Sequence, residues 1–341
     1  MERLVVGVDV GKHELVAALW EGPRGRVLGS YTNDERGRQA LGAAVAALQA
    51  ERGGGAVQLI VEPTGGYEAE VVLLAQAQGW LFSRVNPHQL RQWAKGIGRR
   101  AKTDRQDALL LARYGVERRP APQQLPAAEL RELERLLRRR EDLQDLLRQE
   151  RNRLETMRRA QEQSGAVIQS LERVIEALEA ALRDLEAAIR EHLRSQAHLA
   201  AEARRLQQLP GLGPTNSLPL LVLLERFQAH TAGQGNSKAL VAFVGLDPQP
   251  HTSGTSVSKP TIISRQGNRT LRRLLFMAAL AAIRTTHTPA RQFYDRLVRR
   301  GKPKMVALIA LARKLLLWAW ELFRTKQDFD PSRYQPCHLA P

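Results

Sequence analysis

The sequence predicts an α/β domain at the N-terminus, a long helical arm in the middle and a mainly α-helical domain at the C-terminus. Three observations lead to this prediction. Short apolar runs alternate with helical patterns over residues 1–117. Leucine and isoleucine repeat at three- and four-residue spacing over 133–189. Helical segments rich in arginine and apolar residues then occupy 207–329.

The first domain, 1–117, is expected to open with a β-hairpin. We expect strands over 1–20 and 26–32, joined by a turn that contains glycine and proline. Further strands are expected to end at Glu62 and Val85. Helices are expected at about 37–51, 66–78, 87–95 and 104–115. This alternation of strands and helices is typical of an α/β domain.

Residues 118–206 are expected to form a proline-marked linker and then an antiparallel coiled-coil arm. Arg140 and Glu150 interrupt its apolar repeat, and at such positions they favour partners on another helix or chain. The repeat consists of Leu133, Leu136, Leu143, Leu147, Leu154 and Met157, followed by Ile168, Leu171, Ile175, Leu178, Leu182, Leu185 and Ile189. We predict two helices that turn back near residue 164, and a homo-oligomer (dimer or tetramer) joined through this arm.

The third domain, 207–329, is expected to contain a helix-hairpin-helix motif and a polar loop. Gly211 and Gly213 lie in a turn between two helical patterns, and exposed backbone N–H groups of such turns bind phosphate. A tight turn with a glycine cap is the alternative. The polar loop covers 251–259. Residues 330–341 are expected to form a disordered tail.

The charge of the chain predicts a polyanionic partner. The net charge is +17, and sixteen Lys and Arg against two acids give residues 259–326 a charge of +14. The basic residues are interleaved with apolar ones and form no tail, which favours nucleic acid over a membrane surface. Candidate nucleic-acid-binding residues are Lys12, Arg100, Lys102, Arg105, Gly211, Gly213, Lys259, Arg265, Arg269, Arg272 and Arg273.

Cysteine usage and hydropathy indicate a cytoplasmic protein. The single cysteine, Cys337, excludes an internal disulfide framework and a zinc-ribbon cluster. The N-terminus has no signal-peptide pattern. The longest apolar stretch, 305–323, is interrupted by Arg313 and Lys314, so we expect a buried helix there rather than a membrane span. We therefore expect a cytoplasmic, nucleoid-associated prokaryotic protein with no membrane partner.

Four acidic residues form the candidate catalytic set. Asp9 and Glu62 each end an apolar run, and Asp104 and Asp107 lie three residues apart on one face of a helix. Carboxylates on rigid elements hold the hard cations Mg²⁺ or Mn²⁺, and two such ions can cleave a phosphodiester. Each residue alone is more often a cap or turn residue. Together the four match the layout of RNase H-like and RuvC-like nucleases.

Two other patterns are less specific. The segment 7–12 is similar to the first phosphate loop of sugar and acetate kinases, but a kinase needs further glycine-rich nucleotide loops and has no use for the C-terminal charge. Ser253 would attack phosphorus only if a base or a metal activated its hydroxyl. Serine is ordinary in such a loop, and spacing names no base, since His251 is only two residues away.

Seven short motifs follow one another along nearly the whole chain. They are Gly7-Val8-Asp9-Val10-Gly11-Lys12, Val61-Glu62-Pro63-Thr64-Gly65-Gly66-Tyr67, Lys102-Thr103-Asp104-Arg105-Gln106-Asp107-Ala108, Leu209-Pro210-Gly211-Leu212-Gly213-Pro214, Phe243-Val244-Gly245-Leu246-Asp247-Pro248, Ser253-Gly254, and Ser264-Arg265-Gln266-Gly267-Asn268-Arg269-Thr270-Leu271-Arg272. As an ordered set, they resemble the insertion-sequence transposases of the IS one-ten type. These proteins are also called DEDD transposases and bridge-RNA-guided recombinases.

The resemblance implies a RuvC-like first domain and a C-terminal transposase domain with a nucleophilic serine, Ser253. The implied DEDD metal ligands are Asp9, Glu62, Asp104 and Asp107. Members of the family cut and rejoin donor and target DNA through a covalent phosphoserine, at a composite site between protomers. A structured noncoding RNA from the element pairs with both DNAs. Ser256 and Ser258 lie close to Ser253 in this sequence.

Two alternatives stay open at the level of sequence. A RuvC-like, Mg²⁺-dependent nuclease or junction resolvase would use water, and Ser253 would be structural. A non-catalytic nucleic-acid-binding scaffold would keep the fold without the chemistry. Rejoining through a covalent linkage needs no ATP, because the linkage preserves the phosphodiester energy, and the sequence has no Walker A pattern.

Overall fold

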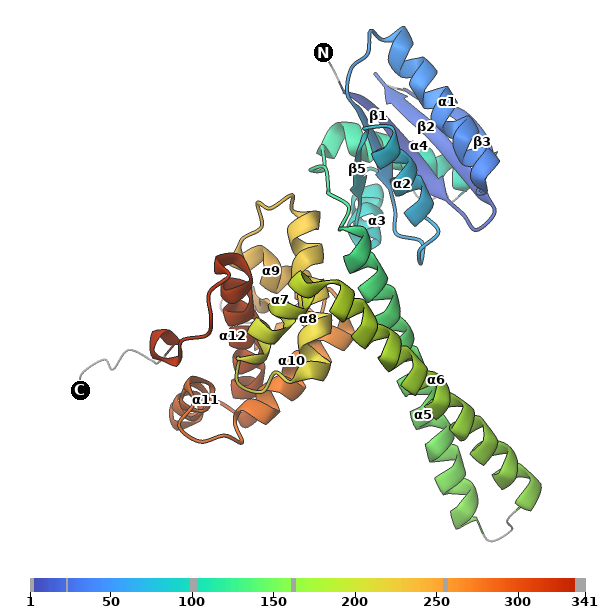
Figure 1. Cartoon of the computed structure of the whole chain (residues 1–341). Helices are drawn as coiled ribbons and strands as arrows, with labels where there is room; N and C mark the ends of the chain where they lie inside the picture. Colours follow the sequence, from blue (N-terminus) through green and yellow to red (C-terminus); the bar gives the residue numbers. More distant parts are fainter. Residues whose placement is uncertain (1–2, 23, 99–102, 161–163, 254–256, 335–341) are drawn as a thin grey trace. The chain divides into compact units, whose positions relative to one another are not determined.

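The computed structural model describes residues 3–22, 24–98, 103–160, 164–253 and 257–334 (Figure 1). The chain forms two compact units. Unit 1 consists of Met1–Leu125 and Gln228–Gln234, and unit 2 consists of Pro126–Phe227 and Gly235–Pro341. Our division into three domains and a tail is finer, because the long helices and the C-terminal helices fall within the same unit. That finer division stays a prediction.

Unit 1 is built on a five-stranded mixed sheet with the strand order β3-β2-β1-β4-β5. The first three strands are antiparallel to one another, whereas β1, β4 and β5 are parallel. The strands are β1 (Leu4–Val10), β2 (Glu14–Glu21), β3 (Arg24–Thr32), β4 (Val57–Val61) and β5 (Leu81–Arg84). The helices are α1 (Glu35–Glu51), α2 (Ala69–Ala77), α3 (Pro87–Gly96) and α4 (Asp104–Arg118). The predicted α/β class of this region is confirmed.

Different helices cover the two faces of this sheet. Side chains alternate between the faces along a strand. Val6 and Val8 of β1 pack in one apolar cluster with Leu41 of α1. Ile60 of β4 lies on the opposite face and packs with Leu111 of α4. The central strands are apolar on both faces because both faces are covered.

Strand β1 and helix α4 approach so closely that only glycine fits between them. A Cβ atom on Gly7 would lie 2.2 Å from the backbone nitrogen of Ala112 and 2.4 Å from the carbonyl oxygen of Ala108. A Cβ atom on Gly115 would lie 2.5 Å from Cγ1 of Val5. Because Val5 meets the end of α4 and Gly7 meets its earlier turns, α4 runs antiparallel to β1.

The N-terminal hairpin differs from the one we expected. A single strand over 1–20 is wrong, because the chain reverses after β1 and returns as β2. The register runs from Val6 opposite Leu19 to Val10 opposite Leu15. The N–H of Gly11 donates to the carbonyl oxygen of Glu14 at 2.8 Å and closes the turn. Apolar residues on both sides of this short turn hid the reversal in the sequence.

Two long helices of unit 2 lie side by side (Figure 1). They are α5 (Ala128–Arg159) and α6 (Gly165–Ser195). Ion pairs join Arg151 to Glu179 at 2.7 Å and Arg158 to Glu172 at 2.6 Å, so the helices are antiparallel. Ile175 of the predicted apolar repeat is buried. The two expected helices and the position of the reversal between them are confirmed.

The remaining helices of unit 2 surround one apolar core. They are α7 (Ala197–Gln207), α8 (Pro214–His230), α9 (Ser237–Val244), α10 (Arg269–Ala282), α11 (Pro289–Arg299) and α12 (Lys304–Thr325). Trp318, Phe227 and Phe323 are the largest of its fully buried side chains. The stretch 305–323 thus forms the buried helix that we expected. None of the helices that the structure describes combines the length and hydropathy of a membrane span.

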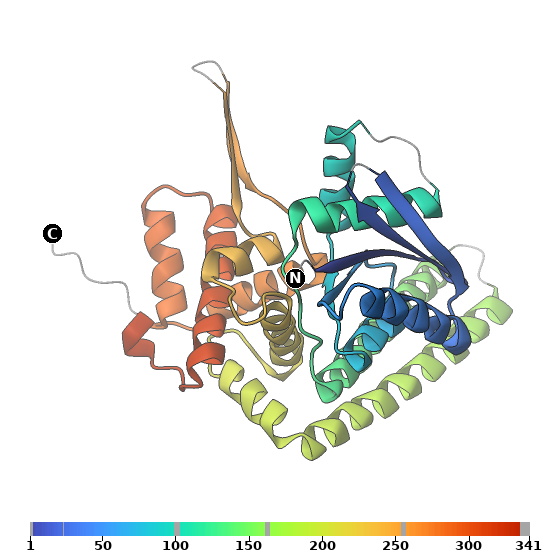
Figure 2. The same ribbon diagram turned by 90° about the horizontal axis from the view of Figure 1, so that it is seen from above.

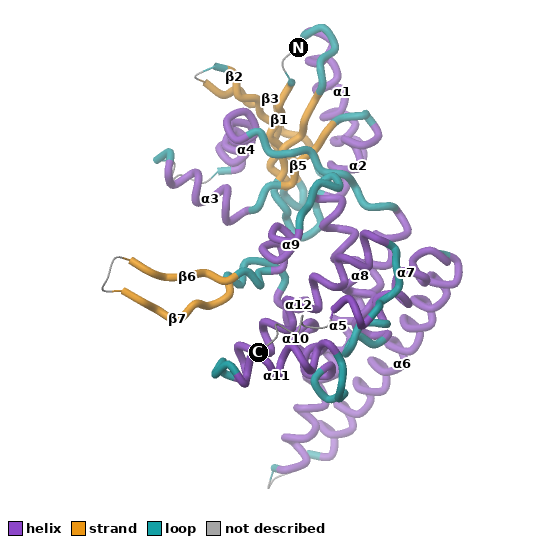
Figure 3. The backbone as a smooth tube through the Cα atoms, turned by 90° about the vertical axis from the view of Figure 1, so that its left-hand side faces the viewer, coloured by secondary structure: helices purple, strands orange, loops and turns teal. Residues whose placement is uncertain are grey.

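A two-stranded hairpin extends from the helices of unit 2 (Figures 2 and 3). Its strands are β6 (Pro248–Ser253) and β7 (Val257–Ile263). The pairing is antiparallel, with His251 opposite Lys259 and Ser253 opposite Val257. The loop that we expected over 251–259 is therefore wrong. Threonine, valine and isoleucine favour extended backbone, but the many serines in this segment masked the pattern.

The chain end also differs from the prediction. Residues 331–334 form a short 3₁₀ helix, η1 (Pro331–Tyr334), where we expected a disordered tail. The ring of Tyr334 stacks on Phe329 at 5.0 Å and contacts Trp318 at 5.2 Å. These ring contacts explain why residues 331–334 adopt a defined structure. No local sequence pattern predicts them, because Trp318 and Phe329 lie elsewhere in the chain. Residues 335–341, with Cys337, lie outside the described residues.

We expect Gly7→Ala to lower the free energy of unfolding by about 1–3 kcal/mol, because the added methyl group must displace the backbone of α4. Gly96→Ala is the matched control, since a Cβ atom there has no neighbour within 4 Å. The control is expected to change stability by less than about 1 kcal/mol. Urea denaturation followed by circular dichroism measures both. A Gly7→Ala variant as stable as the wild type would contradict the close approach.

Candidate active site

Asp9 and Glu62 lie at the same edge of two adjacent parallel strands. The register of β1 and β4 pairs Val8 with Val61, so Asp9 and Glu62 are the next residues of each strand path. Gly7 and Ile60 face α4, and Asp9 and Glu62 come two positions after them. Because side chains alternate between the two faces along a strand, Asp9 and Glu62 lie on the face that α4 covers. Both acids are half-buried. The fold therefore brings these two predicted residues together.

The first turn of α4 supplies Asp104 and Asp107. Thr103 caps this helix, and its Oγ1 accepts a hydrogen bond from the N–H of Gln106 at 3.3 Å. Because α4 runs antiparallel to β1, its N-terminal turn points toward the strand end that carries Asp9. Asp104 is exposed and Asp107 is half-buried. Acids in a first turn also stabilise the helix dipole, which is the purely structural explanation of this pair.

The four acids do not form a ready-made cation site. In the part of the chain that the structure describes, no three His, Cys, Asp or Glu side chains are disposed to hold a metal ion together. Oε1 of Glu62 lies 4.0 Å from Nη2 of Arg91 on α3. Carboxylate oxygens are the ligands that Mg²⁺ prefers, so the chemistry of the donors fits a divalent cation. Their positions share one edge without converging.

A buried carboxylate holds the loop that follows Glu62. Glu68 is 8% exposed, and its Oε2 accepts hydrogen bonds from the N–H groups of Thr64 at 3.1 Å and Gly66 at 3.0 Å. Gly65 and Gly66 have φ values of 78° and 116°, which glycine adopts readily. Burial raises the pKa of the Glu68 carboxyl, but the backbone hydrogen bonds and the charge of an arginine outweigh it, so the pKa is lowered.

Two basic candidates of unit 1 flank the acids. Lys12 is exposed in the turn directly after β1, and Arg105 is exposed in the first turn of α4. Arg100 and Lys102 lie outside the described residues. Sequence reasoning missed Arg91, which lies on the polar side of an amphipathic helix. Its proximity to Glu62 depends on how α3 packs, and no spacing in the sequence reports that.

Ser253 lies at the end of β6, and the base of its hairpin is anchored by a carboxylate. The hydroxyl of Ser264 donates to Oδ1 of Asp247, and Nε2 of Gln249 donates to Oδ2 at 2.8 Å. Burial raises the pKa of Asp247, but these hydrogen bonds and a nearby arginine lower it overall. Like Glu68, Asp247 is an acid whose role in holding a loop the sequence analysis did not predict.

Two glycine-mediated contacts lock the motifs on either side of this hairpin together. Gly245 has a φ of 76°, and a Cβ atom on it would lie 2.6 Å from the carbonyl oxygen of Gln266. Gly267 has a φ of 142°, and a Cβ atom on it would lie 2.5 Å from the carbonyl oxygen of Phe243. The end of α9 and the loop before α10 thus interlock. The hairpin extends from this interlocked base.

The arginines beside the hairpin differ in their surroundings. Arg265 and Arg269 are exposed. Arg273 is exposed and pairs with an acid of α5 at 3.6 Å. Arg272 is half-buried, and its Nη1 donates to the carbonyl oxygen of Val244 at 3.1 Å. Burial and the charges of Arg265 and Arg269 lower the pKa of Arg272. Arg272 therefore has a structural role, at the end of α9.

Gly211 and Gly213 lie in the turn between α7 and α8. Gly211 has a φ of 81°, and a Cβ atom on it would lie 2.1 Å from the carbonyl oxygen of Ala278 on α10. The space around Gly213 is open, and its carbonyl oxygen accepts the N–H of Asn216 at 3.1 Å. Close packing against α10 explains Gly211 without any phosphate ligand.

We expect Glu68→Gln to lower the free energy of unfolding at pH 7 by about 1.5–3 kcal/mol, because an amide accepts the backbone hydrogen bonds less strongly. A carboxyl whose pKa is lowered on folding stabilises the fold above its unfolded value, 4.5, and loses this effect as the pH falls through the folded-state pKa. The difference in the free energy of unfolding between wild type and Glu68→Gln should therefore become smaller at acidic pH. Urea denaturation across pH measures it, with Glu70→Gln on the same helix as control. A deficit independent of pH would contradict this role.

Two family models match the chain in order. The model for DEDD transposases of IS110 elements, described as "Transposase", matches residues 6–160. The model described as "Transposase IS116/IS110/IS902 family" matches residues 203–295. The first match includes the sheet of unit 1 from Val6 onward, and the second includes the hairpin with its interlocked base.

Proteins similar to this chain include one of matching length. The pilin gene-inverting protein of Moraxella lacunata is 29% identical over 339 residues, which are 97% of this chain and 98% of that protein. The "Insertion element IS110 uncharacterized 43.6 kDa protein" of Streptomyces coelicolor is 32% identical over 143 residues, 40% of this chain and 33% of that protein.

One solved structure, "T. thermophilus RuvC in complex with Holliday junction substrate", is 17% identical and covers 33% of this chain and 90% of that chain. Its TM-score of 0.25 is too low to establish a shared fold. The two family models identify the family, because they match residues 6–160 and 203–295 in the order expected from the sequence motifs. The chain belongs to the IS one-ten (IS110) family of transposases.

Proposed function

We propose that this transposase cuts and rejoins donor and target DNA strands through a phosphoserine intermediate, guided by a structured noncoding RNA. One observation carries the proposal. Asp9 and Glu62 follow paired residues of adjacent parallel strands, on the face where α4 brings Asp104 and Asp107. Membership of the family supports DNA as the substrate.

The four carboxylates are the proposed ligands of Mg²⁺ or Mn²⁺, in a RuvC-like arrangement. A cation bound there would polarise a phosphodiester as a Lewis acid. Like charges repel, so the side chains would converge only with a cation between them. Strand ends and a helix terminus are rigid supports, and a bound cation would draw the acidic side chains from their present partners into a shared site. This accounts for acids that share an edge without forming a cage.

Ser253 is the proposed nucleophile. Its oxygen would bond to phosphorus while one phosphorus–oxygen bond of the DNA backbone breaks. The serine proton would leave to a base, and the released DNA oxygen would take up a proton. The reverse reaction rejoins strands without ATP. The anchored base of the hairpin supports this assignment, because a nucleophile must be held within narrow limits. Ser256 and Ser258 are the alternatives.

The proposed guide is the bridge RNA of the family. If base pairing reads the sequence, the protein needs mainly positive charge directed at backbones. The charge of +14 over 259–326 meets that need. Exposed Arg265 and Arg269 beside the hairpin, and Lys12 and Arg105 beside the acids, are the proposed phosphate contacts. A helix-hairpin-helix contact through Gly213 would add to these.

The helix pair α5–α6 is the proposed coiled-coil arm that joins protomers. Val167 and Val174 are seven residues apart on α6 and 41% and 43% exposed, so they form a half-exposed apolar stripe. Arg140 instead finds a partner inside unit 2, since its Nη2 reaches the carbonyl oxygen of Thr215 at 3.4 Å. The stripe, rather than Arg140, is therefore the feature that favours a second chain.

We expect Ser253→Ala to abolish the covalent protein–DNA adduct and to reduce strand exchange by roughly three orders of magnitude or more. Ser256→Ala and Ser258→Ala are the matched controls, and both should stay active. A denaturing gel detects the adduct, and plasmid recombination with the guide RNA reports strand exchange. Cleavage that persists in Ser253→Ala would indicate a nuclease that uses water. Normal strand exchange in Asp9→Asn would contradict metal-dependent chemistry at the four acids.

Replacing both stripe residues, Val167→Glu and Val174→Glu, is expected to dissociate the oligomer, because four or more buried charges cannot be paired across the interface. Gln169→Glu with Ala177→Glu adds the same charge at exposed positions of α6 and is the matched control. Light scattering after size exclusion gives the mass, and circular dichroism verifies helicity. An unchanged mass in a helical stripe variant would refute the arm interface.

A further inference from the structure

A cavity of about 520 Å³ lies along one side of α12. Its lining includes Ser237, Lys314, Trp318, Arg324, Arg333 and Tyr334. None of these residues belongs to the candidate active site. Among the lining residues of α12, Lys314, Trp318, Glu321 and Arg324 are three or four positions apart, so they lie along one side of that helix. The cavity is large enough for a small organic ligand.

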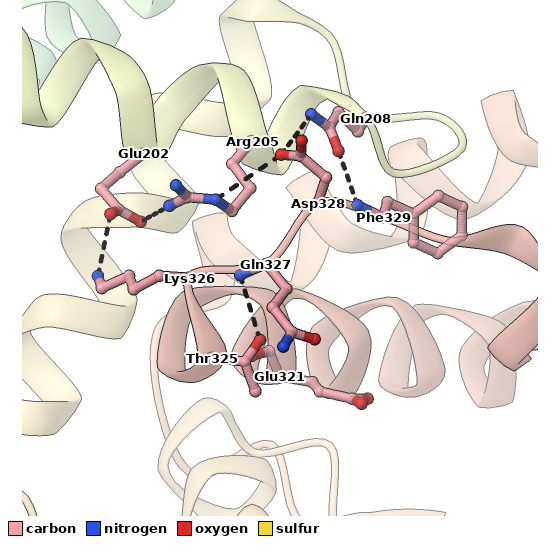
Figure 4. A network of polar contacts seen from close by, with 9 residues as sticks. All are labelled: Glu202, Arg205, Gln208, Glu321, Thr325, Lys326, Gln327, Asp328 and Phe329. Carbon is pink, nitrogen blue, oxygen red and sulfur yellow. Dashed lines mark hydrogen bonds and ion pairs between the residues drawn. The ribbon is translucent and has the colours of Figure 1, made fainter.

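One wall of the cavity is the strap, defined as residues 326–334. A polar network fixes the strap to α7 (Figure 4). Nζ of Lys326 lies 3.1 Å from Oε1 of Glu202. Gln208 accepts the N–H of Phe329 at 2.7 Å and donates to Oδ1 of Asp328 at 3.0 Å. The strap therefore holds Tyr334 in place against Trp318, and the cavity does not depend on a loose chain end.

The cavity is positively charged. Within the described residues, neither Lys314 nor Arg324 has a carboxylate within 4.0 Å. Arg333 lies 3.6 Å from Asp330 of the strap. The acid in the lining is Glu321, and burial together with the charge of this acid raises the pKa of Tyr334 to about 12. Two cations are thus left to attract an anion.

Two buried indole rings lie beside these cations. Trp318 and Trp320 are 2% and 4% exposed, and both line the cavity. Among the described residues, Nε1 of each is buried and finds no acceptor. Lys314 lies 5.8 Å above the ring of Trp318, and Arg324 lies 5.7 Å above the ring of Trp320. Both Nε1 atoms are closed to solvent, so a ligand in the cavity would meet the two cations rather than the indole N–H groups.

We propose that this cavity binds one nucleotide, phosphate together with base, of an unpaired nucleic-acid strand. Cations suit the phosphate, and the half-buried ring of Tyr334 gives the cavity an aromatic wall for a base. A concave site accepts a single extruded nucleotide but not a stacked duplex. Inorganic phosphate alone would have no use for the aromatic wall. The proposal rests on nucleic acid as the partner, which is part of the proposed function.

The test uses the full-length protein in EDTA, so that strand cleavage does not contribute. Probes are ten-nucleotide oligo-dT and oligo-rU with a central 5-iodouracil, which crosslinks to nearby aromatic side chains. Lys314→Gln with Arg324→Gln is the cavity variant. Arg183→Gln with Arg190→Gln, at exposed positions of α6, removes the same charge and is the control. Fluorescence anisotropy gives affinity, and peptide mass spectrometry locates the crosslink.

We expect the cavity variant to weaken binding of at least one probe about tenfold, with the control within about twofold. The crosslink should fall on the peptide that carries Trp318 or Tyr334. Whether DNA or RNA loses affinity identifies the strand. Equal losses in both variants, or a crosslink confined to other peptides, would overturn the cavity proposal. Phosphate that displaces the probe as well as a nucleotide does would reduce it to an anion site and also overturn it.

These outcomes separate the two proposals. If the wild type binds the oligonucleotides and the cavity variant binds equally well, only the cavity proposal fails. If Ser253→Ala recombines normally but the cavity variant loses the crosslink, the proposed chemistry fails and the cavity proposal stands. Tyr334→Ala, which opens the strap wall, should also lose the crosslink while Gln327→Ala on the same strap keeps it.

Discussion

The contact between the backbones of β1 and α4 is the constraint on which the candidate active site depends. Because no side chain fits at Gly7, the helix lies directly on the strand. The first turn of the helix is thereby held toward the strand end that carries Asp9. Register with β4 adds Glu62 on the same face. Without this approach the acids would belong to unrelated surfaces, and the divalent-cation proposal would lose its structural basis.

Unit 2 uses glycine in the same way. Gly245 and Gly267 let two motifs interlock at the base of the hairpin, and Gly211 lets a turn press on α10. Of the two glycines that we predicted to bind phosphate, Gly211 is thus explained by packing. These contacts hold in place a hairpin that bears Ser253, the proposed nucleophile, with exposed Arg265 and Arg269 beside it.

The sequence was most informative where local pattern decides the structure. Apolar periodicity predicted the α/β unit, the paired helices and the buried α12, and the strand-end positions of Asp9 and Glu62 followed from it. Local pattern missed the reversal at Gly11, the hairpin over 248–263 and the docked Tyr334, because pairing partners or distant rings determine these features. Glu68, Arg91 and Asp247 were missed for the same reason, since hydrogen bonds and ion pairs made only in the fold give them their roles.

The central claim is that four acids close around a divalent cation at the edge of the sheet. Anomalous diffraction from crystals of the protein grown with Mn²⁺ tests it most directly. The account predicts an anomalous peak about 2.1 Å from carboxylate oxygens of Asp9, Glu62 and at least one of Asp104 and Asp107. A crystal that contains Mn²⁺ elsewhere but none between these residues would contradict it.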